Sequence, residues 1–309
     1  MENKKWDVFI YGDVNIDLVI PGVSELPSPG QEVETDTMDT FVGGGAALFA
    51  LGLGKLGKKV AFQGSVGGDF YGGYILDVFK SRGIDCSYVD KKEDEKTGIS
   101  LSFTNEKDRS FLTMRGTNEY LDIMNLNFEK LRLSRHFHVT GYACEQNHDS
   151  YLKLVKHIKS ETDLTVSFDL GWDPTGIWSK KIYELFPYID VLFMNQSEAL
   201  NYSRKSTARS AAEDFASYCP LVAIKLGSKG ALAAADGKIT EKSSFQVKAV
   251  DTTGAGDSFN AGFIYAYLEG KSPEECLLYG NGCGALSVTK LGGNTGFPDI
   301  ETLIEIINR

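Results

Sequence analysis

Short apolar segments alternate with longer segments of helical periodicity along most of the chain. From residue 58 onward, strand and helix patterns succeed each other, which is typical of parallel βαβ units. The sequence therefore predicts an α/β fold with a doubly wound, mainly parallel sheet flanked by helices. The predicted strands are 8–12, 60–64, 136–140, 165–169, 191–194 and 222–226, and the predicted helices are 46–55, 71–83, 149–160 and 207–217.

A second group of strand patterns mixes polar with apolar residues. Residues 14–20 and 32–41 have this mixed character, and 98–104 and 110–115 read as a hairpin around the polar turn 105–109. We expect these segments, within roughly 13–41 and 97–116, to form a small β-sheet lid over the main sheet. Because no repeat or low-complexity tract divides the chain, one domain over residues 1–309 is expected.

The composition narrows the class of ligand. The chain has 309 residues, 42% of them hydrophobic and 24% charged, with a formal net charge of -10. Its lysines and arginines are scattered, which argues against binding nucleic acid or an anionic membrane and favours a small ligand. The polar residues 1–6 lead directly into a strand without a signal-peptide core, so a cytoplasmic location is expected. The five cysteines form no CxxC pair and are interpreted as ordinary thiols.

Residues 251–263, with the sequence DTTGAGDSFNAGF, carry the clearest chemical signal. A small-residue loop here leads into a helix predicted over 259–268. Free N–H groups at a helix N-terminus and the helix dipole both favour binding of a phosphate group. Asp257 lies beside that position and is a suitable acceptor for the proton of an attacking hydroxyl. Taken alone, the loop is equally compatible with a glycine turn and a capping Asp257.

The run 251–263 resembles the C-terminal signature of the ribokinase-like carbohydrate and nucleoside kinases, the PfkB family. Further segments resemble family motifs and occur in the family's order, and the resemblance extends from about Val8 to Pro298. These segments are GDVNID at 12–17, GGGAA at 43–47, VGGDFYG at 66–72, NQSE at 195–198 and KLGSKG at 225–230.

The resemblance implies an ATP-dependent kinase that phosphorylates a hydroxyl of a sugar-like acceptor. Asn15 and Asp17 are then expected to hydrogen-bond the acceptor, which would lie against the backbone of Gly43 and Gly44. Asp257 is the expected catalytic base. The N–H groups expected to stabilise the transferred phosphoryl group belong to Gly254, Ala255 and Gly256.

The same resemblance implies a nucleotide site. Glu198 is expected to help organise Mg²⁺ through water, although 195–198 alone also fits a capped helix start. Asp251 and Thr253 are the local candidates for a monovalent cation, typically K⁺, and a homodimer through the lid is a further implication. The expected nucleotide-binding residues are Asn195, Lys225, Gly227, Gly230, Asn281 and Gly284.

Two departures from the family pattern weaken a specific assignment to ribose. Gly45 stands where ribokinase often has lysine, which also disfavours an acceptor that already carries phosphate. Leu48 stands where asparagine is common, and either a differently shaped pocket or helix packing accounts for it.

Several other polar and aromatic residues remain open to interpretation. Arg109 and Arg115 flank the second hairpin strand and could reach an acceptor, although a solvated arginine is the commoner case. Asp169 ends a predicted strand, near the site or as a cap. His136 and His138 alternate on one strand without a third metal ligand nearby, and Trp172 and Trp178 are interpreted as packing residues.

Two other functions are compatible with the same pattern. One is a nucleoside kinase of the same fold, and the other is an inactive protein that senses a sugar or nucleotide. A dinucleotide-binding site is rejected because GLGKLG at 52–57 ends a helix, whereas that motif requires a strand followed by a helix. A Walker loop is rejected because Tyr265 occupies a required glycine position.

Overall fold

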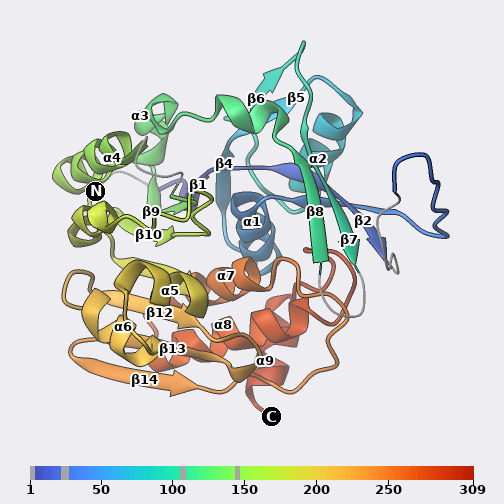
Figure 1. Cartoon of the computed structure of the whole chain (residues 1–309). Coiled ribbons are helices and arrows are strands. Elements are labelled where there is room, and N and C mark those ends of the chain that lie inside the picture. Colours follow the sequence, from blue (N-terminus) through green and yellow to red (C-terminus); the bar gives the residue numbers. More distant parts are fainter. Residues whose placement is uncertain (1–3, 22–27, 105–108, 143–146) are drawn as a thin grey trace.

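The computed structural model describes residues 4–21, 28–104, 109–142 and 147–309. Within this part of the chain, the main sheet has eight strands in the order β14-β13-β12-β11-β10-β9-β1-β4 (Figure 1). The strands from β12 to β4 in that order are parallel, and β13 and β14 extend one edge in antiparallel fashion. Their bounds are β1 Trp6–Tyr11, β4 Val60–Gln63, β9 Ser134–Thr140, β10 Thr165–Asp169, β11 Val191–Asn195, β12 Leu221–Lys225, β13 Ala231–Ala235 and β14 Lys238–Lys242.

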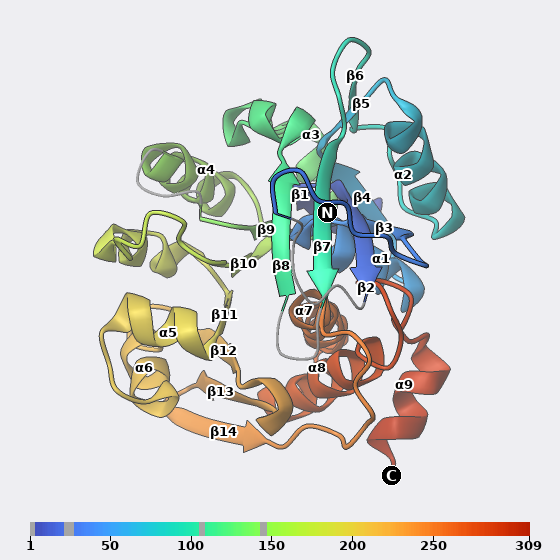
Figure 2. The same cartoon turned by 45° about the vertical axis from the view of Figure 1, so that its right-hand side comes forward.

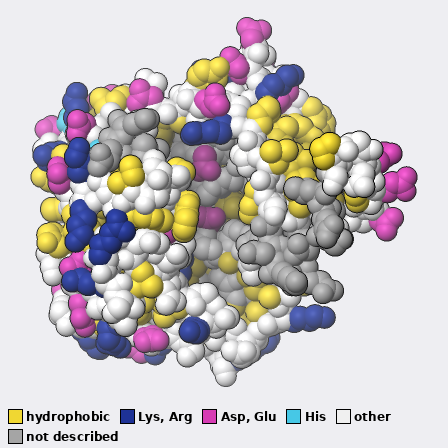
Figure 3. Space-filling view, viewed as in Figure 1, with side chains coloured by type: hydrophobic (Ala, Val, Ile, Leu, Met, Phe, Trp, Pro, Cys, Tyr) yellow, Lys and Arg dark blue, Asp and Glu magenta, His cyan; other side chains and the backbone are white. Residues whose placement is uncertain are grey.

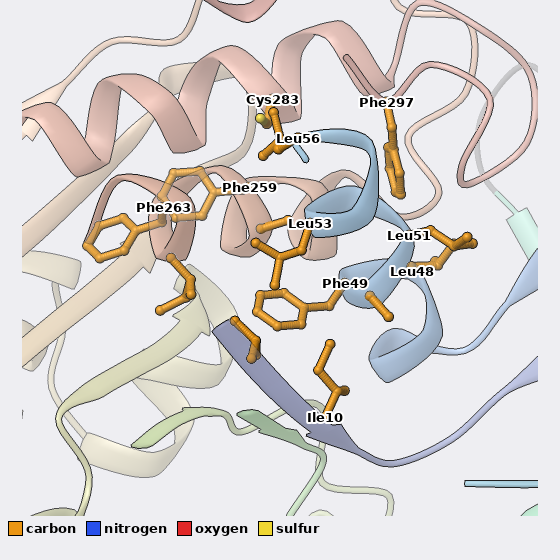
Figure 4. Close-up of a cluster of buried hydrophobic side chains, with 14 of the residues drawn as sticks. Ile10, Leu48, Phe49, Leu51, Leu53, Leu56, Phe259, Phe263, Cys283 and Phe297 are labelled. Atoms are coloured by element: carbon orange, nitrogen blue, oxygen red, sulfur yellow. The ribbon is translucent and has the colours of Figure 1, made fainter. Parts of the chain in front are cut away.

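Helices cover both faces of the main sheet, and each face has its own buried apolar cluster. On one face, Phe49, Phe259 and Phe263 come together from two helices, as Figure 4 shows. Full burial of such rings makes them costly to truncate, about 3–5 kcal/mol for Phe→Ala. That face carries α1 Gly45–Lys55, α2 Phe70–Ser81, α7 Ala255–Leu268, α8 Pro273–Ser287 and α9 Ile300–Ile307. The other carries α3 Phe128–Leu131, α4 His148–Glu161, α5 Gln196–Ser203 and α6 Ala208–Phe215.

A second sheet of four strands is separate from the main sheet (Figure 2). Its strand order is β3-β2-β7-β8, with β2 parallel to β7 and the other pairs antiparallel. The bounds are β2 Asn15–Pro21, β3 Asp39–Gly43, β7 Gly98–Thr104 and β8 Arg109–Met114. A short pair of parallel strands, β5 Ser65–Gly67 and β6 Asp90–Lys92, completes the described sheets.

The predicted fold class is confirmed, but two predicted boundaries are wrong. The strand expected over 32–41 begins only at Asp39, because residues 32–38 are all exposed and have no partner strand. The helix expected to begin at Phe259 begins at Ala255. Gly254 caps this helix with a left-handed φ of 70°, which glycine adopts without strain. Asp257 is therefore inside the first helical turn and not in the loop before it.

In the described residues, we find no helix with the length and apolar character needed to span a membrane.

Candidate active site

A cavity of about 910 Å³ opens where the carboxyl ends of the central strands face the second sheet. Tyr11, Thr140, Asp169 and Lys225 are the last residues of β1, β9, β10 and β12, and all four line it. Thr113 and Met114 of β8 form part of the opposite wall. In Figure 3, this face of the molecule is hollowed, with acidic side chains inside the hollow and a basic one at its rim. Ligands of open α/β sheets commonly bind at this end of the strands.

Two helices direct their N-termini at the cavity. α7 begins beside Asp257, whose side chain is half-buried and lines the cavity. α1 begins at Gly45, and a Cβ atom placed on Gly45 would lie 3.4 Å from Oδ1 of Asp257. The turn before α7 is tightly packed, because a Cβ atom on Gly254 would lie 2.5 Å from the carbonyl oxygen of Gly293. The glycines thus bring the Asp257 carboxylate and the first N–H groups of α7 close to α1.

β2 and β3 bring together the residues predicted to bind the acceptor. Asn15 lines the cavity and its amide donates a 2.8 Å hydrogen bond to Oδ1 of Asp17. Asp17 occupies the space where a side chain at Gly43 would stand, since a Cβ there would lie 2.3 Å from its Cγ. Gly44 has a left-handed φ of 94°, and its missing side chain leaves room for the backbone at Asp13. Asn15, Asp17 and Gly43 are therefore in direct contact, with Gly44 next to them, and Asn15 is the member of this group that lines the cavity.

Asp13 holds the N-terminus of α1. Its two carboxylate oxygens accept hydrogen bonds of 3.1 Å from the backbone N–H groups of Gly45 and Ala46. The hydroxyl of Thr140 lies 3.4 Å from the same carboxylate. Asp13 also lines the cavity, and the Oδ1 atoms of Asp257 and Asp13 lie 3.4 and 3.9 Å from the position of a Cβ atom on Gly45, so both carboxylates are close to this residue.

Lys225 is a largely buried cation of the site, with its side chain 14% exposed. Its ammonium group lies 2.6 Å from Oδ2 of Asp169 and 3.3 Å from Oδ1 of Asn260. The amide of Asn260 donates a 2.5 Å hydrogen bond to the same carboxylate oxygen. A Cβ atom on Gly256 would lie 3.3 Å from Nζ of Lys225, so the ammonium group closely approaches the backbone at Gly256. The ammonium group of Lys225 thus lies next to the first turn of α7.

Burial and crowded charges shift the ionisation of this cluster. Burial, together with the Asp169 carboxylate, raises the pKa of Asp257 well above its ordinary value, and Lys225 opposes this. Burial and Asp169 also raise the pKa of Glu198 to about 7. Burial alone would lower the pKa of Lys225, but the Asp169 and Glu198 carboxylates outweigh it and raise it. A group with a high proton affinity in a cleft is suited to general acid–base chemistry.

Comparison with known protein families matches residues 5–300 to the family described as pfkB family carbohydrate kinase. The chain belongs to the pfkB family of carbohydrate kinases. An uncharacterized sugar kinase of Archaeoglobus fulgidus is 32% identical over 250 residues, which are 80% of this chain and 98% of the relative. A 5-dehydro-2-deoxygluconokinase of Bacillus velezensis is 28% identical, over 99% of this chain and 96% of the relative.

Solved structures agree with this assignment. A ribokinase of Arabidopsis thaliana, complexed with ribose and ATP, superimposes with a TM-score of 0.85 at 25% identity, covering 98% of this chain and 99% of that one. The predicted resemblance and the predicted enzyme class, an ATP-dependent carbohydrate kinase, are confirmed.

Glu198 of this carbohydrate kinase combines two features that the sequence left as alternatives. Asn195 and Glu198 form a reciprocal capping box at the start of α5, with hydrogen bonds of 2.8 and 2.9 Å. Glu198 nevertheless lines the cavity with an exposed fraction of 6%. In the described residues no three acidic, histidine or cysteine side chains gather as a metal site. A single carboxylate, that of Glu198, fits Mg²⁺, because this ion is commonly held by one or two carboxylates together with water and phosphate oxygens.

The other predicted nucleotide residues lie beyond the cavity lining. Gly227 and Gly230 follow β12 with left-handed φ values of 62° and 107°. Asn281 is buried in α8, where its amide donates to the carbonyl oxygens of Lys242 and Ser243. Gly284 lies beside the start of α7, where a Cβ would be 3.4 Å from the carbonyl oxygen of Ala255. Their role toward a nucleotide stays a prediction.

Asp251 and Thr253 form a closed turn before α7. Oδ1 of Asp251 accepts hydrogen bonds from both the N–H and the hydroxyl of Thr253, at 2.9 and 2.7 Å. Its Oδ2 accepts a 2.9 Å bond from the N–H of Gly292. The carboxylate therefore joins the segment before α7 to the segment after α8.

Some of the residues whose role the sequence left undecided line the cavity, and others are buried in the protein interior. Leu48 is buried and packs against Gly254 and Gly293, which favours the packing interpretation. Trp178 is buried as expected, whereas Trp172 is 62% exposed and lines the cavity while its ring packs edge-on against Trp178, with the ring centroids 4.8 Å apart. Arg115 lines the cavity, whereas the side chain of Arg109 lies outside the described residues.

His136 and His138 face the same side of β9. Both rings are buried and both hydrogen-bond the hydroxyl of Ser167 at 2.6 Å. Burial lowers the pKa of both imidazoles well below their ordinary value, so they are neutral.

Sequence reasoning missed Asp13 and Asn260 and left Asp169 undecided. Asp13 lies within the GDVNID segment and Asn260 within the DTTGAGDSFNAGF segment, so both stood beside residues that were named. A polar residue at the carboxyl end of a predicted parallel strand was the available signal for Asp169.

Proposed function

We propose that this kinase transfers the γ-phosphoryl group of ATP to a hydroxyl of a sugar or sugar-like small molecule, with Asp257 as the base. The observation that carries the proposal is the half-buried Asp257 carboxylate at the N-terminus of α7, in a cavity that Asn15 also lines. In the proposed reaction, the acceptor hydroxyl gives its proton to Asp257 while its oxygen attacks the γ-phosphorus. The bond from that phosphorus to the bridging oxygen breaks, and ADP leaves.

Each group near the reaction has a definite task in this proposal. The acceptor is oriented by Asn15, Asp17 and the backbone at Gly43 and Gly44. Holding its hydroxyl in a productive position lowers the activation free energy of phosphoryl transfer, because the two reactants no longer have to meet by diffusion. The N–H groups of Gly254, Ala255 and Gly256 stabilise negative charge on the phosphoryl oxygens. The second sheet acts as a lid whose closure keeps water from competing with the acceptor.

The nucleotide is proposed to lie along β12, α5 and α8. Lys225 would contact its phosphates, and Asn195, Gly227, Gly230, Asn281 and Gly284 would surround the remainder. Glu198 would hold Mg²⁺ through water, and the ion would neutralise charge on the polyphosphate. A reaction that consumes ATP also fits the cytoplasmic location expected from the sequence.

The test is an ADP-release assay with MgATP over a panel of pentoses, hexoses, sugar acids and nucleosides, with product identification by mass spectrometry. We expect ADP release that depends on one class of sugar acceptor, with a phosphate ester as product. Preference for nucleosides would replace the acceptor class. ATP binding without turnover of any acceptor would favour the sensor instead.

A monovalent cation beside the loop of Gly254, Ala255 and Gly256 is the second part of the proposal. Asp251 joins the segments on both sides of α7 and α8, so a cation there would order the loop that carries Gly254. Replacing K⁺ with tetramethylammonium is expected to lower kcat at least several-fold, because that ion is too large for a site of oxygen ligands. Equal kcat in both salts at the same ionic strength would contradict a cation requirement.

The lid is proposed to form a homodimer. β8 is an edge strand, and Phe111, Leu112 and Met114 on it are 56%, 65% and 47% exposed. An exposed apolar edge strand is a ready interface. We expect Leu112→Asp to shift the protein to monomers in sedimentation velocity, whereas Tyr218→Asp, at a residue 48% exposed after α6, leaves the distribution unchanged. A wild-type protein that sediments as a monomer at all concentrations would contradict the dimer.

A further inference from the structure

Acidic side chains outnumber basic ones in the lining of the cavity. Five acidic side chains line it, and among its described lining residues only Lys225 and Arg115 are basic. Lys225 is largely buried and already forms an ion pair with Asp169. Arg115 has no ion pair or side-chain hydrogen bond within the described chain, and it stands at the end of the lid strand β8. The acidic residues of the lining are Asp13, Glu119, Asp169, Glu198 and Asp257.

The N-terminus of α1 is closed to a negatively charged acceptor group. Free N–H groups at a helix start normally attract a phosphate or carboxylate. Here the Asp13 carboxylate accepts from both Gly45 and Ala46 and supplies the negative charge itself. The neighbouring Asp257 carboxylate adds further repulsion. The end of the acceptor that meets Asp257 is therefore uncharged.

The backbone of Arg115 is fixed in position relative to β2, the strand that begins with Asn15. Three residues later, Asn118 accepts a hydrogen bond from the N–H of Val14 and donates one to the carbonyl oxygen of the same residue, at 3.2 and 3.0 Å. Between them, the buried hydroxyl of Thr117 donates a 2.9 Å bond to the carbonyl oxygen of Ser65. Val14 immediately precedes Asn15, so these anchors hold the backbone of Arg115 at a set place beside the acceptor site.

We infer that the acceptor is a sugar acid, whose carboxylate pairs with Arg115 while the hydroxyl at its other end meets Asp257. This inference rests on the proposed function. A guanidinium group binds a carboxylate through two parallel hydrogen bonds and so gives direction as well as affinity. The carboxylates of Asp13 and Asp257 in the cavity lining repel the carboxylate of the acceptor and so favour the same orientation. The hydroxyl groups between the two ends are left for Asn15 and Asp17.

The test compares acceptors that differ only at the carboxylate. Each sugar acid is paired with the neutral polyol that carries a hydroxymethyl group in its place, as D-gluconate with D-glucitol and D-galactonate with galactitol; keto-deoxy sugar acids extend the panel. The measured quantity is the ratio of kcat/KM for acid over polyol. We expect the preferred acid to exceed its partner by about 10- to 100-fold, the range for a hydrogen-bonded charged pair. Arg115→Met should collapse this ratio, mainly through KM, and Arg115→Lys should retain part of it.

A control variant and two contrary outcomes distinguish failure of the sugar-acid inference from failure of the kinase function. Arg209→Met removes the same charge from the exposed surface of α6 and is expected to leave the ratio unchanged. Equal turnover of acids and polyols, or an acid preference that survives in Arg115→Met, would overturn the inference while the kinase function stands. Absence of ATP-dependent phosphorylation of every sugar and sugar acid would overturn the proposed function itself.

Discussion

Replacing Asp257 with Asn is expected to lower kcat by roughly 10³-fold or more, within the range of about 10² to 10⁴ that a general base contributes, because the amide cannot accept the hydroxyl proton. ATP affinity should change little, since the N–H groups of Gly254 and Gly256 remain. Steady-state kinetics and calorimetric ATP titration measure the two effects separately.

The same substitution is expected to stabilise the protein near neutral pH. Burial and the Asp169 carboxylate raise the pKa of Asp257 in the fold, so its ionised form costs stability at every pH above the ordinary value of about 4. Asn removes this cost, and the gain in Tm should therefore disappear as the pH falls below about 4. Loss of activity with a raised Tm distinguishes a catalytic role from damage to the fold. A variant with near-normal kcat would refute the assignment.

Replacing Lys225 with Met is expected to be damaging in both activity and stability. Asp169 would be left buried without its 2.6 Å partner, and breaking a buried pair by removing one member costs about 3–5 kcal/mol. We also expect kcat to fall by about 10²-fold, because the cation that opposes the raised pKa of Asp257 and reaches the α7 turn is lost. Thermal melts and steady-state kinetics measure the two effects.

A second substitution separates these two effects. In Lys225→Met combined with Asp169→Asn, no uncompensated carboxylate remains at this position, so much of the lost stability should return. The kcat value should not recover, because the ammonium group is still missing. Recovery of both quantities in the double variant would show that Lys225 serves only to neutralise Asp169.

The roles of Asn15 and Asp17 and of the glycine loop before α7 could be predicted because each group lies within a short run of sequence. Asn15 and Asp17 share one face of β2, and Gly254 to Asp257 lie within one turn at the start of α7. Their approach to each other was implied by the resemblance to the family rather than by the order of the parallel strands, because β2 belongs to the second sheet and the loop before α7 follows the antiparallel strand β14. The start of α7 was misplaced because small residues and glycine give no clear helix signal.

The charge network beneath the site could not be predicted in the same way. Lys225 and Asp169 are 56 residues apart, and Asn260 is 91 residues from Asp169. Neither pairing has a local signal, because only the packing of β10, β12 and α7 brings the groups together. The role of Asp13 was hidden for a related reason, since its partners at Gly45 and Ala46 lie 32 and 33 residues away.

The most direct test of the account is a single-turnover measurement of phosphoryl transfer from ATP, by rapid quench, with wild type and Asp257→Asn at saturating ATP and acceptor. This experiment isolates the chemical step from product release, which limits kcat in many enzymes. We predict formation of the acceptor phosphate with a rate constant roughly 10³-fold lower in the variant, at unchanged ATP affinity. Rate constants within tenfold of each other would contradict the central claim that Asp257 is the catalytic base.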